Sequence, residues 1–309
     1  HLYSNQLYTA RSDGSDVQKL TSGRGFSVKN FAWHQDNRRI YIQYEERGKE
    51  VLALLAQDGT VSKLSDELSG WELDQPYVMG QFSANAGVAA ITQGHATKPT
   101  ELAVIDRLGK VITLTDLNRD LHESVQLVPA AAYSIKSSFD KREIQYWVML
   151  PPDFDPQKSY PMILHIHGGP WAAYGAQFAA NNQLYAAAGY VVVFGNPRGS
   201  TGYGAEFTES IDHDYPSRDY DDLMDIVDSV LAQGFIDEDK LYVTGGSGGG
   251  VLTAWIVGKT NRFRAAVVVN PVINWSSQLL IGDRKKLFVN KWFADLPWND
   301  PMDYWSHSP

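Results

Sequence analysis

A run of glycines around a single serine, residues 245–250, constrains this chain more than any other part of its sequence. The apolar residues 241–244 before it predict a short buried strand, and the apolar spacing of residues 251–257 predicts a helix. A strand, a sharp turn and a helix with the pattern G-x-S-x-G form a nucleophile elbow, in which a serine hydroxyl stands at the apex of a strained turn. The sequence therefore predicts that Ser247 is a nucleophile.

Glycine runs also occur in flexible linkers and in phosphate-binding loops, and both alternatives fit this stretch less well. Linkers are not bordered by a buried strand and an apolar helix. The dinucleotide-binding pattern G-x-G-x-x-G is not met in any register. Gly258, Lys259 and Thr260 match the end of a P-loop, but Thr253 occupies the position where that pattern requires its first glycine. Motif and context together favour the nucleophile interpretation.

Composition removes several classes of function and leaves the cellular location open. The 309 residues carry a formal net charge of -9, whereas nucleic-acid-binding proteins usually present a basic face. There is no cysteine, so neither disulfides nor zinc–thiolate sites can form, and no apolar run is long enough to span a membrane. The chain starts at His1 without a visible signal peptide, so we expect a segment to be missing there. The location stays open between the cytoplasm and the periplasm or secretion.

Residues 1–130 contain an internal repeat. Leu20, Leu64 and Leu114 each lie in a K-L-T, K-L-S or T-L-T element that follows a D-G or L-G turn, and they recur at spacings of 44 and 50 residues. Four short strands in a repeat of about this length are typical of a β-propeller blade. We predict part of an all-β propeller, about two to three blades, with earlier blades upstream of His1. The alternative is a small β-sandwich.

From residue 131 to 309 the pattern changes from repeated hairpins to alternating strands and helices. Such alternation indicates a mostly parallel sheet with helices on both faces. Two of the strands, residues 191–194 and 265–269, are continuous apolar runs, which predicts that both of their faces are buried. The predicted elements are strands 162–166, 191–194, 241–244 and 265–269 and helices 177–188, 220–233 and 249–257.

Two further motifs follow strands of this predicted sheet. They are H-G-G-P at residues 167–170 and N-P-R-G-S-T-G-Y-G at residues 196–204. In an α/β-hydrolase, the loop after the first of these strands gives one backbone N–H to the oxyanion hole, and the residue after the nucleophile gives the other. Pro170 has no N–H, so the candidate donors are Gly169 and Gly248. The alternative for H-G-G-P is an ordinary glycine turn.

With the repeats, H-G-G-P, R-G-S-T-G-Y-G and G-G-S-G-G-G in this order, the sequence resembles the prolyl oligopeptidase family of serine peptidases, most of all its acylaminoacyl-peptidase and dipeptidyl aminopeptidase branch. The resemblance implies an α/β-hydrolase domain behind a propeller, no cofactor, and an acyl-enzyme formed on Ser247 from short peptides or N-acylaminoacyl peptides. It also implies that Gly169 and Gly248 offer the oxyanion N–H groups. Many members carry tyrosine after the serine, so Gly248 departs from the family pattern but keeps the N–H.

The rest of the catalytic machinery is not recognisable in the sequence. In this fold the triad acid and histidine follow the serine at the ends of later strands, whereas His307 is the only histidine after Ser247 and comes too early. We therefore expect a fragment, an α/β-hydrolase domain cut before its last strands, with the triad Asp and His beyond Pro309. Two alternatives stay open: a carboxylesterase of the same fold and a non-catalytic propeller–hydrolase scaffold.

The remaining expectations concern partners and pockets. We expect a peptide substrate and no metal, nucleic acid or membrane, and we leave homo-oligomer formation open. One segment is rich in aromatic residues and either lines an apolar substrate pocket or packs a core. Its members are Trp292, Phe293, Trp298, Tyr304 and Trp305.

Overall fold

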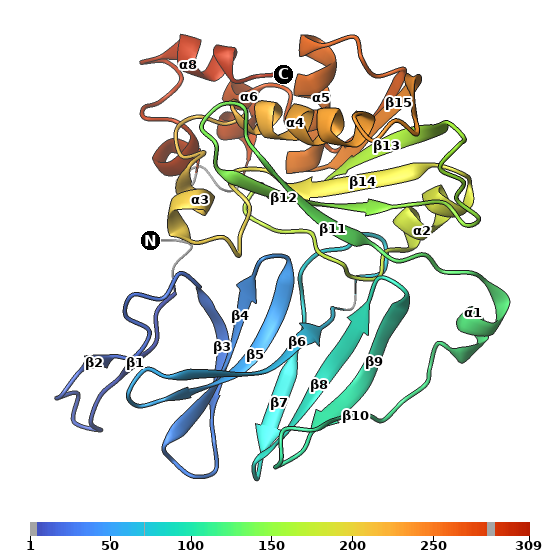
Figure 1. The fold of residues 1–309 in the computed structure, drawn as a ribbon. Coiled ribbons are helices and arrows are strands. Elements are labelled where there is room, and N and C mark those ends of the chain that lie inside the picture. Colours follow the sequence, from blue (N-terminus) through green and yellow to red (C-terminus); the bar gives the residue numbers. More distant parts are fainter. Residues whose placement is uncertain (1–4, 71, 283–287) are drawn as a thin grey trace. The chain divides into compact units, whose positions relative to one another are not determined.

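The computed structural model describes residues 5–70, 72–282 and 288–309, and the chain divides into two compact units (Figure 1). Unit 1 comprises His1–Leu127 and the short segments Gly175–Ala180 and Thr201–Glu206. Unit 2 comprises Val128–Tyr174, Asn181–Ser200 and Phe207–Pro309. Each unit has a sheet of its own, so the two are described in turn.

Unit 1 is built from short antiparallel strands. They are β1 (Tyr8–Thr9), β2 (Gln18–Lys19), β3 (Val28–Trp33), β4 (Arg39–Glu46), β5 (Lys49–Ala56), β6 (Val61–Leu68), β7 (Phe82–Asn85), β8 (Val88–His95), β9 (Lys98–Ile105) and β10 (Val111–Thr113), followed by the helix α1 (Arg119–Ser124). β1 pairs with β2, and the other strands form one sheet in the order β10-β9-β8-β6-β5-β4-β3, with β7 paired to β8.

This larger sheet consists of two meanders of consecutive strands, β3–β6 and β7–β10. Within the described residues, the register of β6 and β8 contains one pair, Leu68 and Gln93, so few ladder bonds join the two meanders. Four consecutive antiparallel strands also make up a propeller blade, and the propeller itself stays a prediction.

Two tight hairpins set the register within the meanders. β4 and β5 are joined by Arg47 and Gly48, with φ of 49° and 73°, and β7 and β8 by Ala86 and Gly87, with φ of 50° and 77°. Positive φ at both central residues is the geometry of a type I′ turn, whose twist matches that of the flanking strands. The turns thus decide which residues face each other across each hairpin.

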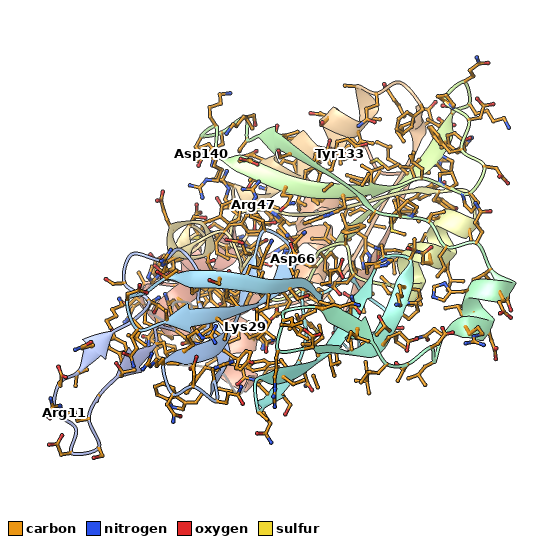
Figure 2. All side chains as sticks on the ribbon, turned by 60° about the horizontal axis from the view of Figure 1, so that its bottom comes forward. Arg11, Lys29, Arg47, Asp66, Tyr133 and Asp140 are labelled. Atoms are coloured by element: carbon orange, nitrogen blue, oxygen red, sulfur yellow. The ribbon has the colours of Figure 1, made fainter. Side chains whose placement is uncertain are left out.

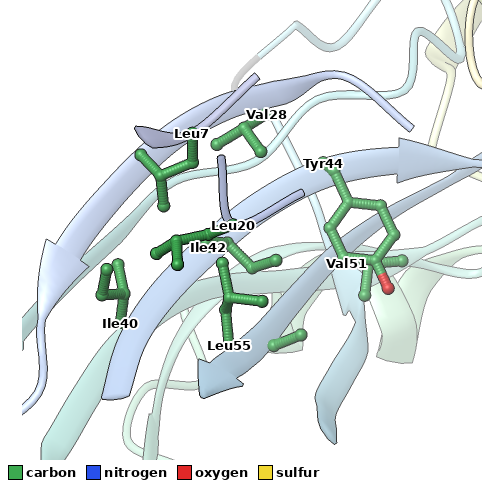
Figure 3. Packing of buried hydrophobic residues seen from close by; sticks show 9 residues of the cluster. Leu7, Leu20, Val28, Ile40, Ile42, Tyr44, Val51 and Leu55 are labelled. Carbon is green, nitrogen blue, oxygen red and sulfur yellow. The ribbon is translucent and has the colours of Figure 1, made fainter. Parts of the chain in front are cut away.

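Apolar side chains cover both faces of β5. Val51, Ala53 and Leu55 belong to one core cluster, which Figure 3 shows with side chains from β3 and β4. Leu52 points the other way, into a second cluster that includes Leu68. Complete burial of one leucine contributes about 2 kcal/mol to stability, and a one-residue slip of β5 would exchange its two faces. Packing therefore reinforces the register that the turns set.

Unit 1 also buries a carboxyl group. Glu50 of β5 is fully buried, with Lys29 Nζ 2.7 Å from its Oε2 and Gln43 Nε2 donating to its Oε1 at 2.5 Å. Burial raises the pKa of Glu50 to about 7 despite the neighbouring lysine. Figure 2 labels Lys29 and also Asp66, which pairs with exposed lysines at 2.8 and 2.9 Å. Exposed ion pairs such as those of Asp66 contribute little to the free energy of unfolding. The charge state of the buried Glu50 therefore affects stability more than these pairs do.

Unit 2 is organised around a six-stranded mixed sheet in the order β11-β12-β14-β13-β15-β16. From residue 131 on, the elements are β11 (Ala131–Lys136), β12 (Glu143–Met149), β13 (Tyr160–Ile166), α2 (Ala180–Ala187), β14 (Val191–Asn196), α3 (Ala205–Glu209), α4 (Asp219–Leu231), β15 (Ile236–Gly246), α5 (Gly248–Lys259), β16 (Ala265–Val269), α6 (Trp275–Ile281), η1 (Phe288–Trp292) and α8 (Pro301–Ser306). The pairs β14–β13, β13–β15 and β15–β16 are parallel. The carboxyl ends of β13 and β15 therefore open side by side, where ligands bind in parallel α/β sheets.

One predicted feature of this sheet is wrong. The apolar run at residues 265–269 does form β16, but β16 is the edge strand of the sheet that the described residues form, and Val267 and Val269 are 61% and 43% exposed. β14 is equally apolar, has a strand on each side and is buried along its whole length. An apolar run indicates that a strand pairs into a sheet but does not indicate whether it lies in the middle or at the edge.

Candidate active site

Ser247 lies between the end of β15 and the first residue of α5. Its backbone is held at φ 55° and ψ −116°, which is unfavourable for any residue with a side chain. Serine at this position usually caps the helix with its oxygen, but Ser247 makes no such bond and is exposed. Its N–H donates to the Val269 carbonyl at 2.9 Å, so the strained turn is tied to β16. The hydroxyl is thus left open to solvent.

Steric crowding explains the neighbouring glycines. A Cβ on Gly245 would stand 2.5 Å from the carbonyl oxygen of Gly249. A Cβ on Gly249 would collide with the carbonyl oxygen of Ile166, at the end of β13. Gly246, by contrast, has no neighbour nearer than 4.0 Å. Gly245 and Gly249, the two glycines of the G-x-S-x-G pattern, are therefore required by the close approach of backbone to backbone. Gly246, at an x position of the pattern, is not.

Gly169 and Gly248, the two predicted oxyanion donors, lie next to each other. A Cβ on Gly248 would stand 3.0 Å from the Gly169 nitrogen and 3.1 Å from the Pro170 nitrogen. Gly169 has φ 123°, which a residue with a side chain rarely adopts. A side chain at position 248 would press on the H-G-G-P loop, so glycine there lets the two loops approach closely.

His167 supports the H-G-G-P loop from below the surface. It is 3% exposed, and burial lowers its pKa to about 4, so the imidazole is neutral near pH 7 and carries one ring proton. Nδ1 lies 2.7 Å from the Gly168 carbonyl oxygen, which can only accept, so Nδ1 donates there. Nε2 lies 2.9 Å from Ser200 Oγ, whose proton is shared with the Pro197 carbonyl at 2.7 Å. The Gly168 carbonyl and the Gly169 N–H belong to one planar peptide group, so His167 fixes the orientation of both.

Aromatic rings pack beside this region. Trp171 stacks on Trp292, with centroids 5.1 Å apart and planes inclined by 7°. Trp292 in turn lies 5.9 Å from the ring of Tyr215 and 4.9 Å from that of Trp275. Of the aromatic-rich segment identified in the sequence, Trp292, Phe293 and Tyr304 are buried, whereas Trp298 and Trp305 are 64% and 67% exposed. The sequence did not single out Trp171, Tyr215 or Trp275, because these contacts join residues far apart in the chain.

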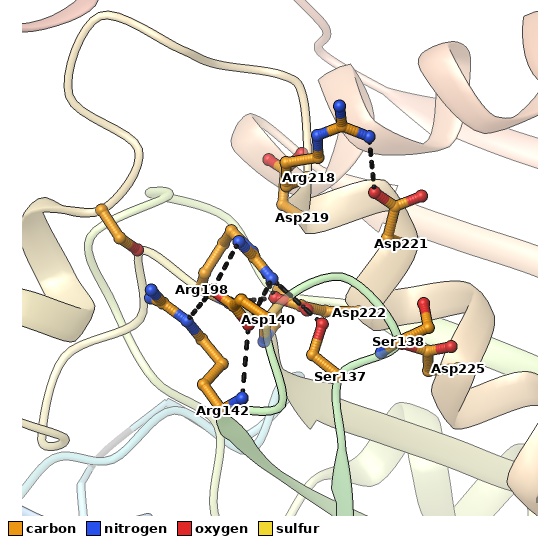
Figure 4. A network of polar contacts seen from close by, with 12 residues as sticks. Ser137, Ser138, Asp140, Arg142, Arg198, Arg218, Asp219, Asp221, Asp222 and Asp225 are labelled. Carbon is orange, nitrogen blue, oxygen red and sulfur yellow. Dashed lines mark hydrogen bonds and ion pairs between the residues drawn. The ribbon is translucent and has the colours of Figure 1, made fainter.

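Arg198, in the third motif, anchors the loop after β14 (Figure 4). Its Nε and Nη2 donate to the two oxygens of Asp222 at 2.8 and 2.7 Å, and Nη2 also donates to Ser137 Oγ at 3.1 Å. Arg198 is 5% exposed and Asp222 is fully buried. A buried, two-point arginine–carboxylate pair holds its partners in one geometry, so it fastens this loop to α4.

His307 is hydrogen-bonded to two aspartates. Its Nε2 lies 3.5 Å from Asp214 Oδ1, and its Nδ1 lies 2.9 Å from the Asp303 carbonyl oxygen. The bond to Asp214 raises the pKa of His307. Among the residues that the structure describes, no imidazole makes a hydrogen bond to the Ser247 hydroxyl.

The described residues also bear on two other classes of site. Within these ranges, no group of His, Cys, Asp and Glu side chains is arranged to hold a metal ion. In the same part of the chain, no helix combines the length and the apolar character that crossing a bilayer requires.

Residues 176–309 match the sequence profile of the prolyl oligopeptidase family of peptidases. This part of the chain belongs to that family. Over 284 residues the chain is 32% identical to the uncharacterized peptidase YuxL of Bacillus subtilis, which covers 90% of this chain and 41% of that protein. Over 285 residues it is 32% identical to dipeptidyl-peptidase 5 of Porphyromonas gingivalis, which covers 91% and 39%. The chain thus spans less than half the length of these curated family relatives.

A solved structure of the family has the same fold. The acylaminoacyl peptidase of Pyrococcus horikoshii superimposes with a TM-score of 0.85 at 24% identity, over 98% of this chain and 46% of that one. At this identity the likeness establishes the fold alone. The mixed sheet of unit 2 is that of an α/β-hydrolase domain, as the sequence predicts.

Proposed function

We propose that the protein is a serine peptidase that cleaves short peptides or N-acylaminoacyl peptides through an acyl-enzyme on Ser247. The observation that carries the proposal is the backbone of Ser247, held at φ 55°, with a side chain that is exposed and does not cap the helix, next to Gly248, which lies against Gly169. Strain of this kind persists only where the surrounding structure enforces it, and it gathers at functional sites. Membership of a peptidase family points the same way.

In the proposed reaction, Ser247 Oγ attacks the carbonyl carbon of the scissile bond. A base takes the hydroxyl proton and passes it to the leaving amine as the C–N bond breaks, which leaves the acyl group on Oγ. A water molecule, deprotonated by the same base, then attacks the acyl group. The carboxylic acid product leaves Ser247 Oγ, which regains its proton from the base. A free serine hydroxyl is a weak nucleophile, so this base is indispensable.

The backbone amides of Gly169 and Gly248 would stabilise the negative charge that develops on the carbonyl oxygen. They come from neighbouring loops, and Gly248 is also the first residue of α5 (Gly248–Lys259). The N-terminus of a helix carries a partial positive charge, which favours an anion at this point. Fixed donors of this kind are usually the largest electrostatic contribution to acyl transfer.

The relatives suggest two substrate classes for this site. One relative is named a dipeptidyl-peptidase, which removes dipeptides, and a protein of the same fold is named an acylaminoacyl peptidase. The two classes differ at the substrate N-terminus, which is a free amine in the first and an acylated amine in the second. A carboxylesterase and a non-catalytic scaffold are the outcomes that would replace this proposal.

A fluorophosphonate probe on the whole protein tests the nucleophile. Ser247 should be labelled, Ser247→Ala should abolish labelling, and Ser277→Ala should not. Ser277 is a matched control, because it is an exposed serine near the start of another helix of unit 2, α6. No labelling of the folded wild-type protein would support a scaffold instead.

Substrate competition then separates the reaction classes. Acetyl-aminoacyl nitroanilides, dipeptidyl nitroanilides and simple nitrophenyl esters are compared by kcat/KM. Preference for either anilide supports a peptidase and identifies its N-terminal requirement. Turnover of the esters alone would make the protein a carboxylesterase.

A further inference from the structure

Tyr215 contacts the nucleophile elbow through Gly248. Its side chain is 1% exposed, and its hydroxyl donates to the carbonyl oxygen of Gly248 at 3.0 Å. Gly248 is also the residue whose N–H, in the preceding peptide unit, is a proposed oxyanion donor. The phenol therefore holds the first residue of α5 through its carbonyl group.

The ring of Tyr215 is itself held in place by aromatic neighbours. It lies 5.9 Å from Trp292 with planes inclined by 23°, and 6.2 Å from Trp275 with planes inclined by 65°. Trp292 stacks on Trp171, which follows the H-G-G-P loop. One stack of rings thus connects the elbow to the loop of Gly169, and a buried ring so confined can hold its hydroxyl at one position.

The hydroxyl keeps its proton. Burial raises the pKa of Tyr215 well above its usual value, and the nearby charge of Asp219 adds to the effect. A phenol that stays protonated stays a donor, and the Gly248 carbonyl can only accept.

We infer that Tyr215 is a positioning residue for the oxyanion hole: its hydroxyl fixes Gly248, so that the N–H of that residue meets the developing oxyanion at the required distance. The inference rests on the proposed function of Ser247 and Gly248. Tyr215 does not touch the reacting atoms and acts only through the backbone of α5.

Loss of the hydroxyl should affect the transition state more than the substrate complex. Removing an oxyanion donor outright lowers kcat by about 10²–10³-fold, and a displaced donor should cost less than a missing one. We expect Tyr215→Phe to lower kcat about 10-fold, with KM unchanged, because a shifted donor still binds the ground state.

Tyr304 offers a matched control within unit 2. It is also fully buried, and its hydroxyl donates to the Asp295 carbonyl at 2.8 Å. Tyr304→Phe removes the same bond between a phenol and a backbone carbonyl, at a place that does not include the elbow. The whole protein carrying either substitution should lose a similar amount of thermal stability, but only Tyr215→Phe should lose kcat. Equal kcat in both variants would overturn the inference.

Hydrogen–deuterium exchange supplies a readout that needs no turnover. In Tyr215→Phe the amides at the start of α5, residues 251–254, should exchange faster than in wild type, and in Tyr304→Phe they should not. Unchanged exchange in Tyr215→Phe would refute the positioning role even in an active enzyme. If the wild-type protein neither turns over peptides nor reacts with fluorophosphonate, the proposed function fails, and the exchange rates still decide whether Tyr215 holds Gly248.

Discussion

The elbow of unit 2 and the hairpin turns of unit 1 use positive φ for different ends. Ser247 has φ 55°, and the hairpin residues Arg47 and Ala86 have nearly the same values, 49° and 50°. In each hairpin a glycine with positive φ follows, which completes a type I′ turn in line with the twist of the strands. At Ser247 the chain instead passes from a strand to a helix, with ψ at −116°.

This difference between the elbow and the hairpins shows which kind of residue with positive φ indicates function. A hairpin position needs only a residue that tolerates positive φ, and asparagine, aspartate or glycine would serve there. The elbow would also be less strained with glycine, yet it carries a serine whose hydroxyl makes no helix cap. A side chain retained against such a cost, with no structural use of its polar group, is best explained by chemistry.

The most severe test of this comparison removes the hydroxyl. Ser247→Ala should lower kcat/KM for a peptide nitroanilide by about 10⁴–10⁶-fold, as loss of a serine nucleophile does in other serine peptidases. Ser247→Gly should be equally inactive, but its melting temperature should be higher than that of Ser247→Ala, because glycine tolerates the backbone of the elbow. Ala86→Gly, at the matched φ of the hairpin, should leave kcat/KM unchanged. Turnover by folded Ser247→Ala would assign the chemistry elsewhere.

A second test compares glycines at the two kinds of turn. Gly249→Ala forces a Cβ onto the Ile166 carbonyl oxygen and should destabilise the protein by about 3 kcal/mol. Gly14→Ala, at φ 82° but with no atom within 4 Å, should cost only about 1 kcal/mol for the backbone conformation. Urea denaturation midpoints measure both. Similar losses would mean that conformation, and not crowding, selects the elbow glycines.

A third test concerns titration beside the β4–β5 hairpin. Because the pKa of Glu50 is raised to about 7 from 4.5, the folded state holds its proton more tightly than the unfolded state. The resulting stabilisation is complete below pH 4.5 and is lost as the pH rises to about 7, at up to about 1.4 kcal/mol per pH unit.

Glu50→Gln should flatten this part of the stability profile, measured as urea midpoints between pH 4.5 and 7.5. Burial also raises the pKa of Asp219 in unit 2 to about 7, so Asp219→Asn should remove a further share of the slope. A wild-type profile that rises over this range would contradict the assignment of both groups.

The mildest test changes the support of the elbow without touching Ser247. His167→Asn keeps an N–H donor at the position of Nδ1, whereas His167→Gln places its amide at the position of Nε2. We expect His167→Gln to lower kcat about 10-fold. His167→Asn should keep most of the wild-type kcat, because a donor on the Gly168 carbonyl orients the Gly169 N–H. His95→Gln, beside a hairpin of unit 1, is the control. Equal losses in both His167 variants would mean that the imidazole serves only packing.

Local sequence patterns predicted much of unit 2. Residues 162–166 and 191–194 lie within β13 and β14, and G-x-S-x-G predicted the strand, turn and helix around Ser247. The proximity of Gly169 and Gly248 followed from the order of the motifs, since the loops after β13 and β15 open at the same edge of the sheet.

Contacts between distant residues could not be predicted in this way. Tyr215 and Gly248 are 33 residues apart, and Arg198 and Asp222 are 24 apart, with no periodic pattern to connect either pair. The apolar run of β16 predicted burial on both faces, and its exposure differs for a related reason, because a strand carries no local sign of how many neighbours it has. Pairing partners belong to the fold as a whole, and one sequence reports mainly local preference.

The crowding at the elbow also has a genetic consequence. Any substitution in a glycine codon that changes the amino acid adds a side chain, and at Gly245, Gly249 and Gly250 that side chain would meet a backbone oxygen that cannot move aside. These three codons therefore tolerate only silent changes. In a saturation library selected for folding alone, before any demand for activity, these three codons should lose nearly all their variants, while the codon of Gly246 keeps many.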